Sequence, residues 1–197
     1  LREVLPGNAM IATAVASPLL TPFKLTFFAA LFLVMPVVLF QVWNFIAPGL
    51  YKNEKRFAIP LLATSIVLFY LGIAFAYFVV FPLIFGFFTS IAPEGVEVQT
   101  DITQFLDFIT TIVFAFGIAF EVPVATVLIV WAGLTNIEKL AKARPYVFLM
   151  AFIAGMFLTP PDVISQSLLA VPVYLLYELG IIMSKVFVSK KSESDSS

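Results

Sequence analysis

The sequence predicts an all-α integral membrane protein with five membrane-spanning helices, and its composition and charge spacing carry this prediction. Hydrophobic residues make up 61% of the 197 residues and charged residues only 12%, with a mean hydropathy of +1.06. A soluble domain has about 25% charged residues, so this chain could not cover its surface with polar groups in water. We expect residues 1–188 to form one membrane domain and residues 189–197 to form a disordered cytoplasmic tail.

The long uncharged segments set the positions of the helices. Residues 25–51 and 57–93 contain no charged side chain, and residues 108–137 contain only Glu121. Two shorter uncharged segments follow before the C-terminal end. A spanning helix needs about 20 apolar residues. We therefore predict membrane helices near residues 23–47, 59–88, 104–131, 144–159 and 162–185.

Capping patterns mark several of the helix starts. Residues 21–22, Thr-Pro, are typical of an N-cap followed by a proline in the first helical turn. Residues 159–162, Thr-Pro-Pro-Asp, end the fourth helix and begin the fifth, with Asp162 as a structural cap. Residues 135–138 form another capping box, which we expect to open a short interfacial helix through Ala143.

Prolines inside the predicted spans are expected to bend the helices into a curved wall. Pro36 lies at mid-depth in the first span, Pro82 lies near the end of the second, and Pro172 lies within the fifth. Because proline has no backbone N–H, it removes one helical hydrogen bond at each of these positions.

The distribution of Lys and Arg predicts how the chain is oriented in the membrane. Cations gather in the loops at residues 48–58 and 133–144 and again near the C-terminal end, whereas the loop at residues 89–103 carries acids and no cation. Short loops that are rich in Lys and Arg stay on the cytoplasmic side. The five helices then alternate, with the first residue outside and the C-terminus in the cytoplasm.

Glu121 is an acid well inside a predicted span. It lies roughly 20 Å along the helix from Asp107 and a similar distance from Gly133, at about 1.5 Å per residue, and hence near the midplane. An ionised acid there costs about 2.5–3.5 kcal/mol, and such residues are usually functional. Pro123 leaves the carbonyl of Ala119 without its helical donor, which favours a wet or protein-lined concavity. The simpler interpretation is a protonated Glu121 that is hydrogen-bonded to a neighbouring helix.

Thr159, Asp162 and Gln166 form a second polar group, at the predicted outer corner of the last two helices. Asp162 and Gln166 are four residues apart and share one helix face. Capping and hydrogen bonds between helices account for Thr159 and Asp162, whereas Gln166 lies a full turn inside an apolar run. Gln166 could receive a polar side chain from a partner helix.

The chain has neither Cys nor His, which excludes several kinds of chemistry. Disulfides, Cys/His metal sites, thiol nucleophiles and Ser-His catalysis all need one of these residues. An intramembrane aspartyl protease would need two Asp at mid-depth, but Asp101, Asp107 and Asp162 all lie near the predicted outer surface. We therefore predict no enzyme activity, no cofactor, no metal site and no nucleic-acid partner.

A proton-coupled solute transporter that uses Glu121 is the alternative function that the residues leave open. One buried acid would suffice for a proton relay. Against this alternative, the sequence contains no internal repeat and no second acid at the same depth. Solute uptake by the purified protein alone would favour the transporter.

Five segments of the chain together resemble the TatC family, the multi-spanning subunit of the twin-arginine protein-translocation system. The resemblance covers the chain from about residue 10 to residue 188. The segments read FIAPGLYKNEKR, FAYFVVFPLIFGFF, FGIAFEVPVA, RPYVFLMAFIAGMFLTPPD and SQSLLAVPVYLLYELG. The family has six helices with both termini in the cytoplasm. The five helices predicted here fit if the first helix is missing, together with the N-terminal signal-recognition residues of the family.

The resemblance gives a role to the cationic loop at residues 48–58. The residues alone favour a simple positive-inside loop in which Glu54 pairs with a neighbouring cation. In the family this loop helps to recognise twin-arginine signal peptides, so the resemblance implies a signal-peptide site at Glu54, Lys52, Arg56 and Phe45. A carboxylate can accept two parallel hydrogen bonds from one guanidinium. The cations would also attract anionic lipid headgroups.

The resemblance also implies partners and a location for the whole chain. It implies a core receptor that binds the signal peptides of folded precursors for proton-gradient-driven export across the bacterial cytoplasmic (inner) membrane. The small single-span proteins TatA and TatB would dock near Met156, Thr159 and Gln166. Glu121 would face the concave side of a cupped helical wall, and the chain would form an oligomer with copies of itself.

Overall fold

The computed structural model describes residues 17–46, 55–91, 101–159 and 163–194, and the regular elements in these ranges are helices. The elements are α1 (Ser17–Ile46), α2 (Lys55–Phe75), the π-helix η2 (Ala76–Val80), α3 (Phe81–Ile91), α4 (Ile102–Ala119), α5 (Val122–Trp131), α6 (Ile137–Leu158) and α7 (Val163–Ser194).

Five stretches of these helices are long and apolar enough to cross a membrane, which confirms the predicted all-α fold with five spans. Two of the stretches combine consecutive elements, because α2, η2 and α3 run on into one another, as do α4 and α5. The stretches are Leu20–Asn44, Pro60–Ser90, Ile102–Trp131, Ile137–Leu158 and Val163–Val186.

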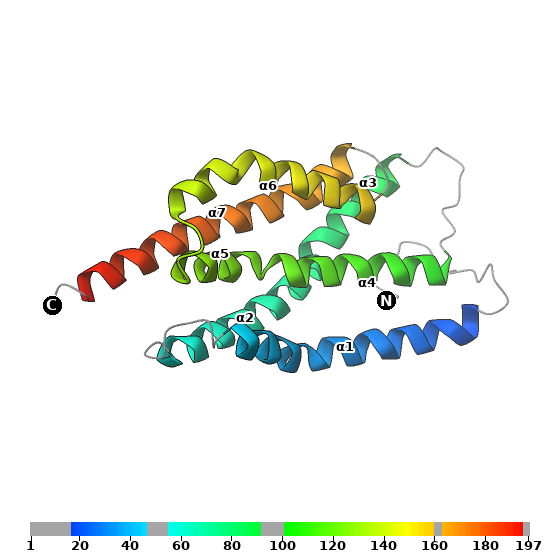
Figure 1. The fold of residues 1–197 in the computed structure, drawn as a ribbon. Coiled ribbons are helices and arrows are strands. Elements are labelled where there is room, and N and C mark those ends of the chain that lie inside the picture. The colour runs from blue at the N-terminus through cyan, green and yellow to red at the C-terminus, as the bar shows by residue number, and fades with distance from the viewer. Residues whose placement is uncertain (1–16, 47–54, 92–100, 160–162, 195–197) are drawn as a thin grey trace.

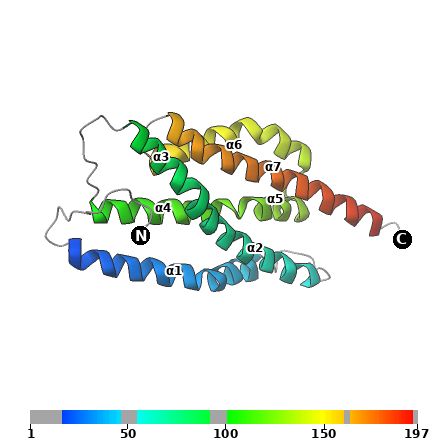
Figure 2. The same cartoon turned by 180° about the vertical axis from the view of Figure 1, so that it is seen from behind.

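The helices form three layers, and the tilted span made of α2, η2 and α3 crosses between them. In Figure 1, α1 lies on one side, α4 and α5 run through the middle, and α6 and α7 lie on the other side. The α2–η2–α3 span runs obliquely from α1 toward the start of α7, and Figure 2 shows it crossing the face of α4 from behind. The middle layer is therefore packed on several sides, whereas α1 touches only α2 and α4 extensively.

Two spans change their helical geometry near a proline. Pro82 cannot donate to the carbonyl of Phe78, and the π-helical turn at Ala76–Val80 precedes it. Pro123 likewise cannot donate to the carbonyl of Ala119, where α4 ends. The predicted break beside Glu121 is thus confirmed. The other predicted bending positions, at residues 36 and 172, lie inside helices that continue through them.

Close glycine contacts hold the tilted span against the middle layer. A Cβ placed on Gly72 of α2 would lie 2.5 Å from the backbone oxygen of Phe116 on α4. One on Gly117 of α4 would lie 2.6 Å from the Phe69 ring of α2. The absence of both side chains lets the two backbones approach closely, which is how helices associate within lipid. Around this crossing the buried core includes Ala76, Val80, Phe81, Ile84, Ile112 and Phe116.

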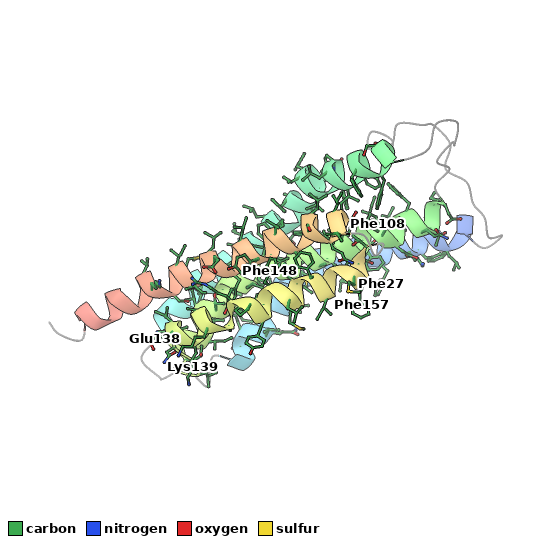
Figure 3. The ribbon with its side chains drawn as sticks, turned by 90° about the horizontal axis from the view of Figure 1, so that it is seen from above. Phe27, Phe108, Glu138, Lys139, Phe148 and Phe157 are labelled. Carbon is green, nitrogen blue, oxygen red and sulfur yellow. The ribbon has the colours of Figure 1, made fainter. Side chains whose placement is uncertain are left out.

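The fourth span differs from its prediction, because the short interfacial helix and the helix at 144–159 are one element. The helix α6 begins at Ile137, where the side chain of Asn136 accepts from the backbone N–H of Lys139 at 2.8 Å. Figure 3 shows Glu138 and Lys139 at one end of α6 and Phe157 toward the other. Charged side chains in the first turns did not end the helix, because long cationic side chains can extend to the membrane surface.

The last span begins at Val163 as expected but runs on to Ser194, beyond the predicted end at residue 185. The predicted disordered tail at 189–197 therefore overlaps the last turns of α7, and residues 195–197 lie outside the described part of the chain. Gly180 on α7 meets α5 closely, since a Cβ there would lie 2.9 Å from the Cα of Pro123. The last helix is thus packed against the segment that follows Glu121.

Candidate functional site

Glu121 lies in the turn between α4 and α5, and its side chain is half-buried. Its backbone N–H donates to the carbonyl of Ile118 at 2.9 Å, as in a tight turn, and its own carbonyl accepts from Ala125 at 2.8 Å. The side-chain hydroxyl of Ser65 on α2 donates to the carboxyl oxygen Oε2. The other oxygen, Oε1, is buried and has no hydrogen-bond partner among the described residues. The acid is therefore held on one side and open to a further donor on the other.

Ser65 is a part of this site that sequence analysis missed. It is completely buried, inside a helix of apolar residues. The position of Ser65 along its helix was the signal that could have found it. Ser65 lies about ten residues, or roughly 15 Å, from the start of α2. Glu121 lies about ten residues, or roughly the same distance, before the end of α5. These helix ends lie at the same end of the bundle (Figure 1), so the two side chains meet at one level.

The predicted docking residues lie where α6 and α7 meet. Gln166 packs against Gly155, with its Cα 3.7 Å from where a Cβ on that glycine would be. Met156 is next to Gly155 and is 55% exposed. The hydroxyl of Thr159 is buried and donates to the carbonyl of Gly155 at 3.0 Å, so it caps its own helix. The structure thus brings Gln166 to the helix end that carries Met156 and Thr159; Asp162 lies outside the described residues.

The predicted signal-peptide residues lie at the ends of α1 and α2 or between them. Phe45 belongs to the last turn of α1, and Arg56 to the first turn of α2. Lys52 and Glu54 lie outside the described residues. The two helix ends lie at the same end of the bundle, which the charge distribution predicts to be cytoplasmic (Figure 1).

Among the described residues, two ion pairs each join two different helices, and neither pair was predicted. Arg144 on α6 meets Glu178 on α7 through two atom pairs, Nε to Oε1 at 2.6 Å and Nη2 to Oε2 at 2.9 Å. Close by, the hydroxyl of Tyr177 donates to the carbonyl of Leu140 at 2.8 Å. These contacts fix α6 and α7 together near the predicted cytoplasmic end.

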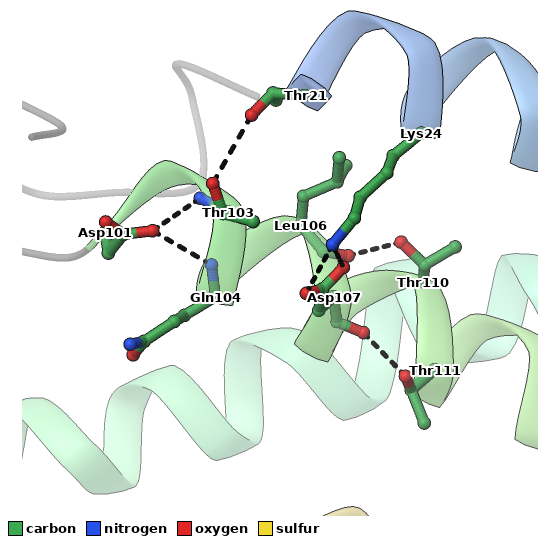
Figure 4. A network of polar contacts seen from close by, with 9 residues as sticks. All are labelled: Thr21, Lys24, Asp101, Thr103, Gln104, Leu106, Asp107, Thr110 and Thr111. Carbon is green, nitrogen blue, oxygen red and sulfur yellow. Dashed lines mark hydrogen bonds and ion pairs between the residues drawn. The ribbon is translucent and has the colours of Figure 1, made fainter. Parts of the chain in front are cut away.

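The second ion pair joins α1 and α4 near the predicted outer end. Lys24 Nζ lies 2.9 Å from both carboxyl oxygens of Asp107. One turn away, the hydroxyls of Thr21 and Thr103 are 3.5 Å apart, and Asp101 caps α4 by accepting from the backbone N–H of Thr103 (Figure 4). Lys24 and Asp107, each of which borders a long apolar stretch of the sequence, therefore form a contact between helices.

The chemistry available in these places is binding and proton exchange. A carboxyl group at mid-depth can accept a hydrogen bond or hold a proton. An amide such as Gln166 can both donate and accept beside an apolar surface.

Comparison with known proteins gives a consistent result over nearly the whole chain. The family model of the Sec-independent protein translocase protein (TatC) matches residues 1–172. The TatC protein of Azotobacter chroococcum is 63% identical over 182 residues, covering 92% of this chain and 71% of its own length. The TatC protein of Escherichia coli (strain K12) is 57% identical over 190 residues, covering 96% of this chain and 74% of its own length.

Solved structures agree with this result at the level of the fold. A crystal structure of the twin arginine translocase receptor TatC matches with a TM-score of 0.84 and 37% identity, covering 94% of this chain and 82% of that one. A second, in DDM, matches with a TM-score of 0.82 and 38% identity, covering 89% and 79%. With its multi-pass helical fold, this chain belongs to the TatC family of Sec-independent protein translocase proteins.

Proposed function

We propose that the chain is the receptor and assembly core of a twin-arginine translocase, which binds twin-arginine signal peptides and recruits TatA and TatB. One observation carries the proposal: over 94% of its length, the chain matches a structure described as the twin arginine translocase receptor, with a TM-score of 0.84. The proposed role consists of binding and assembly and needs no covalent chemistry, so we propose that the chain is not an enzyme.

Glu54 is the proposed acceptor for a signal-peptide arginine. A carboxylate binds one guanidinium through two parallel hydrogen bonds, and this geometry distinguishes arginine from lysine. Lys52 and Arg56 flank Glu54 in the sequence, and we propose that they limit binding by stray cations and contact anionic headgroups. We propose that Phe45, which belongs to the last turn of α1, supplies an apolar contact to the signal peptide.

The α6–α7 end near Met156 is the proposed docking place for the single-span partners. Met156 is 55% exposed and offers a flexible apolar surface. Gln166 lies beside it at Gly155, where a partner helix with a polar side chain could form a hydrogen bond. Thr159 already donates within α6, so its proposed contribution is to shape the helix end rather than to contact the partner.

Glu121 is the proposed intramembrane functional acid, and the proton gradient is the proposed energy source. Its carboxyl has one oxygen occupied by Ser65 and one buried oxygen without a partner among the described residues. We propose that the chain lies in the bacterial inner membrane with its C-terminus in the cytoplasm, as the Lys and Arg distribution predicts. In that orientation Glu54 faces the compartment in which precursors are made.

Photocrosslinking tests the receptor role. A photoreactive residue at position 51 in the full-length protein should crosslink to a twin-arginine precursor in native membranes, and Glu54→Ala should abolish the product. Glu138→Ala is the matched control, since Glu138 is an exposed acid at the same predicted face, and it should leave the product intact. Undiminished crosslinking with Glu54→Ala would remove Glu54 from the proposed site.

The same method tests partner docking separately. A photoreactive residue at position 156 should crosslink to TatA or TatB, whereas one at position 67, on an exposed part of α2, should not. Absence of a partner product at position 156, with normal transport, would contradict docking on α6 and α7.

A further inference from the structure

Many of the Ser and Thr hydroxyl groups on the described helices follow one pattern, and Ser65 departs from it. In apolar surroundings a helical Ser or Thr usually donates to a carbonyl three or four residues earlier in its own helix. Thr64, next to Ser65, does this and donates to the carbonyl of Pro60 at 2.9 Å. The same arrangement occurs at Thr26, Thr110, Thr111, Thr126, Thr159, Ser167 and Ser184. Ser65 instead donates to the side chain of Glu121 on another span.

The position of Ser65 is fixed by the packing of its helix. Ser65, Phe69, Gly72 and Ala76 follow one another at helical spacing and are all buried, so they form one face of the tilted span. Phe69 meets Gly117 of α4, and Gly72 meets the backbone of the same helix. The Ser65 hydroxyl therefore lies on a helix face that is packed closely against α4, and it has little freedom to follow a movement of Glu121.

Glu121 has the opposite character, because it lies at a break in its span. The two residues between α4 and α5 form a turn, and the proline at 123 leaves the helix without one hydrogen bond. A Glu side chain has three rotatable bonds and, without a partner, would sample several orientations. The Ser65 hydroxyl supplies a fixed point for Oε2 and thereby determines where Oε1 lies.

We propose that Ser65 is the positioning residue for Glu121: it holds one carboxyl oxygen against α2 so that the other is presented in a fixed place at mid-depth. The inference rests on the proposed role of Glu121 in transport. A purely structural contact between two helices is the alternative, since interhelical hydrogen bonds of this kind also stabilise membrane proteins. The positioning role and the structural role predict different results in one case. If Ser65 is a positioning residue, its loss affects transport only while the Glu121 carboxyl group is present.

A transport measurement separates these two possibilities. In native membranes with the full-length protein, Ser65→Ala should slow precursor transport about tenfold, the scale expected for one hydrogen bond to a carboxyl group. Thr64→Ala removes a hydroxyl from the neighbouring residue and should leave transport within about twofold, because its bond stays within the helix. In a Glu121→Gln background, which should itself be slow, Ser65→Ala should have almost no further effect.

Infrared spectroscopy tests the contact without relying on transport. The carboxyl band of Glu121 is identified by its disappearance in Glu121→Gln. Ser65→Ala should shift this band, because the hydrogen bond to Oε2 is lost, and Thr64→Ala should not. Ser65→Cys keeps the size and a weak donor, and it should give a smaller shift and a smaller loss of transport; it also serves if Ser65→Ala does not fold.

Each outcome decides the inference. An unchanged carboxyl band in Ser65→Ala, or an equal loss of transport with and without the Glu121 carboxyl group, would overturn it. A shifted band together with normal transport in Glu121→Gln would support the positioning contact and overturn the proposed role of Glu121 instead. A shifted band with a transport loss that depends on Glu121 would support both.

Discussion

The first and third spans are similar in length and hydropathy, yet they are embedded in the protein very differently. Within the most apolar part of each, 6% of the residues are buried in the α1 span and 50% in the α4–α5 span. The middle span is held by backbones in close contact at Gly72 and Gly117, and by Gly180 against α5. The α1 span is held largely at separate points, by Lys24 with Asp107 and by Tyr70, whose hydroxyl donates to the carbonyl of Phe32 at 3.0 Å.

The difference teaches how a uniformly apolar chain gives its helices different strengths of attachment. In lipid, apolar side chains gain little by leaving the bilayer, so burial alone does not order the helices. Close backbone approach adds many dispersion contacts along a seam. Isolated polar contacts add only a few tenths to about 1.5 kcal/mol each. We therefore expect α1 to be the most readily displaced of the described spans.

The largest effect on stability is expected from Gly72→Ala, which directly tests the close contact between α2 and α4. The new Cβ would lie 2.5 Å from the backbone oxygen of Phe116, and a backbone atom cannot move aside without its helix. Overpacking of this kind costs about 1–3 kcal/mol, occasionally more. We expect a clear fall in the thermal unfolding temperature of the purified protein, measured by size-exclusion after heating in detergent.

Gly86→Ala is the matched control for that experiment. Gly86 lies in α3 on the same span, and a Cβ there would meet no atom within 4 Å. Replacing a helical glycine by alanine favours the helix by about 0.8–1.0 kcal/mol, so this variant should be as stable as the natural protein or more so. Equal stability of the two alanine variants would show that the packing of α2 on α4 does not depend on the close approach of their backbones.

An intermediate effect is expected at Arg144 and Glu178, where a polar contact joins two helices that also pack closely. Arg144→Lys keeps the charge but loses the paired geometry, and Glu178→Gln loses the charge. Each should lower the free energy of unfolding by less than Gly72→Ala does and by less than the loss of one partner from a fully buried pair, because 42% of the Arg144 side chain and 24% of the Glu178 side chain remain exposed. The measurement is a double-mutant cycle on the unfolding free energy in detergent.

The double-mutant cycle at Arg144 and Glu178 has a control variant and one outcome that would contradict the prediction. Glu138→Gln removes an exposed acid from the first turn of the same helix and should change stability by less than about 0.5 kcal/mol. If the losses at Arg144 and Glu178 simply add, the two side chains do not interact, and the attachment of α6 to α7 comes from packing alone.

The sequence predicted the parts of the fold that depend on the bilayer. Uncharged stretches of sufficient length gave five spans in their correct order, because the length of a span is set by the membrane rather than by the other helices. The break beside Glu121 was predictable for a similar reason, since proline acts within its own helix. The capping box at residues 135–138 also marks the start of α6, but the sequence predicts a separate span from residue 144, because the cations at 139, 142 and 144 are typical of the membrane surface rather than of a spanning helix.

The contacts between spans could not be predicted, because they depend on the rotation and tilt of each helix. Ser65 is the clearest example: a hydroxyl in an apolar helix normally bonds within that helix, and only the placement of α2 against the break in the third span brings it to Glu121. Arg144 and Glu178 each border an uncharged stretch, and nothing in the sequence relates one of them to the other. Their pairing requires the two helices to be in register.

The smallest effect is expected at Lys24 and Asp107, the contact that ties α1 to the rest of the protein. Both side chains are partly exposed, at 39% and 49%, so a double-mutant cycle with Lys24→Met and Asp107→Asn should give a coupling of only about 0.2–1 kcal/mol. The coupling should fall further in high salt if solvent ions reach the pair. A coupling as large as that between Arg144 and Glu178 would show that α1 is attached as firmly as the packed helices.

A crosslink between α1 and α4 near Lys24 and Asp107 tests whether the weakly attached α1 moves during transport. The hydroxyls of Thr21 and Thr103 are 3.5 Å apart, and the chain has no natural Cys, so Thr21→Cys with Thr103→Cys should form a disulfide on oxidation (Figure 4). Loss of both reactive thiols reports the bond. If α1 separates from α4 during transport, oxidation should slow transport and reduction should restore it, whereas the single variants should be insensitive. Full transport by the oxidised double variant would mean that the loosely buried span keeps its place through the whole cycle, so that weak attachment and movement are separate properties.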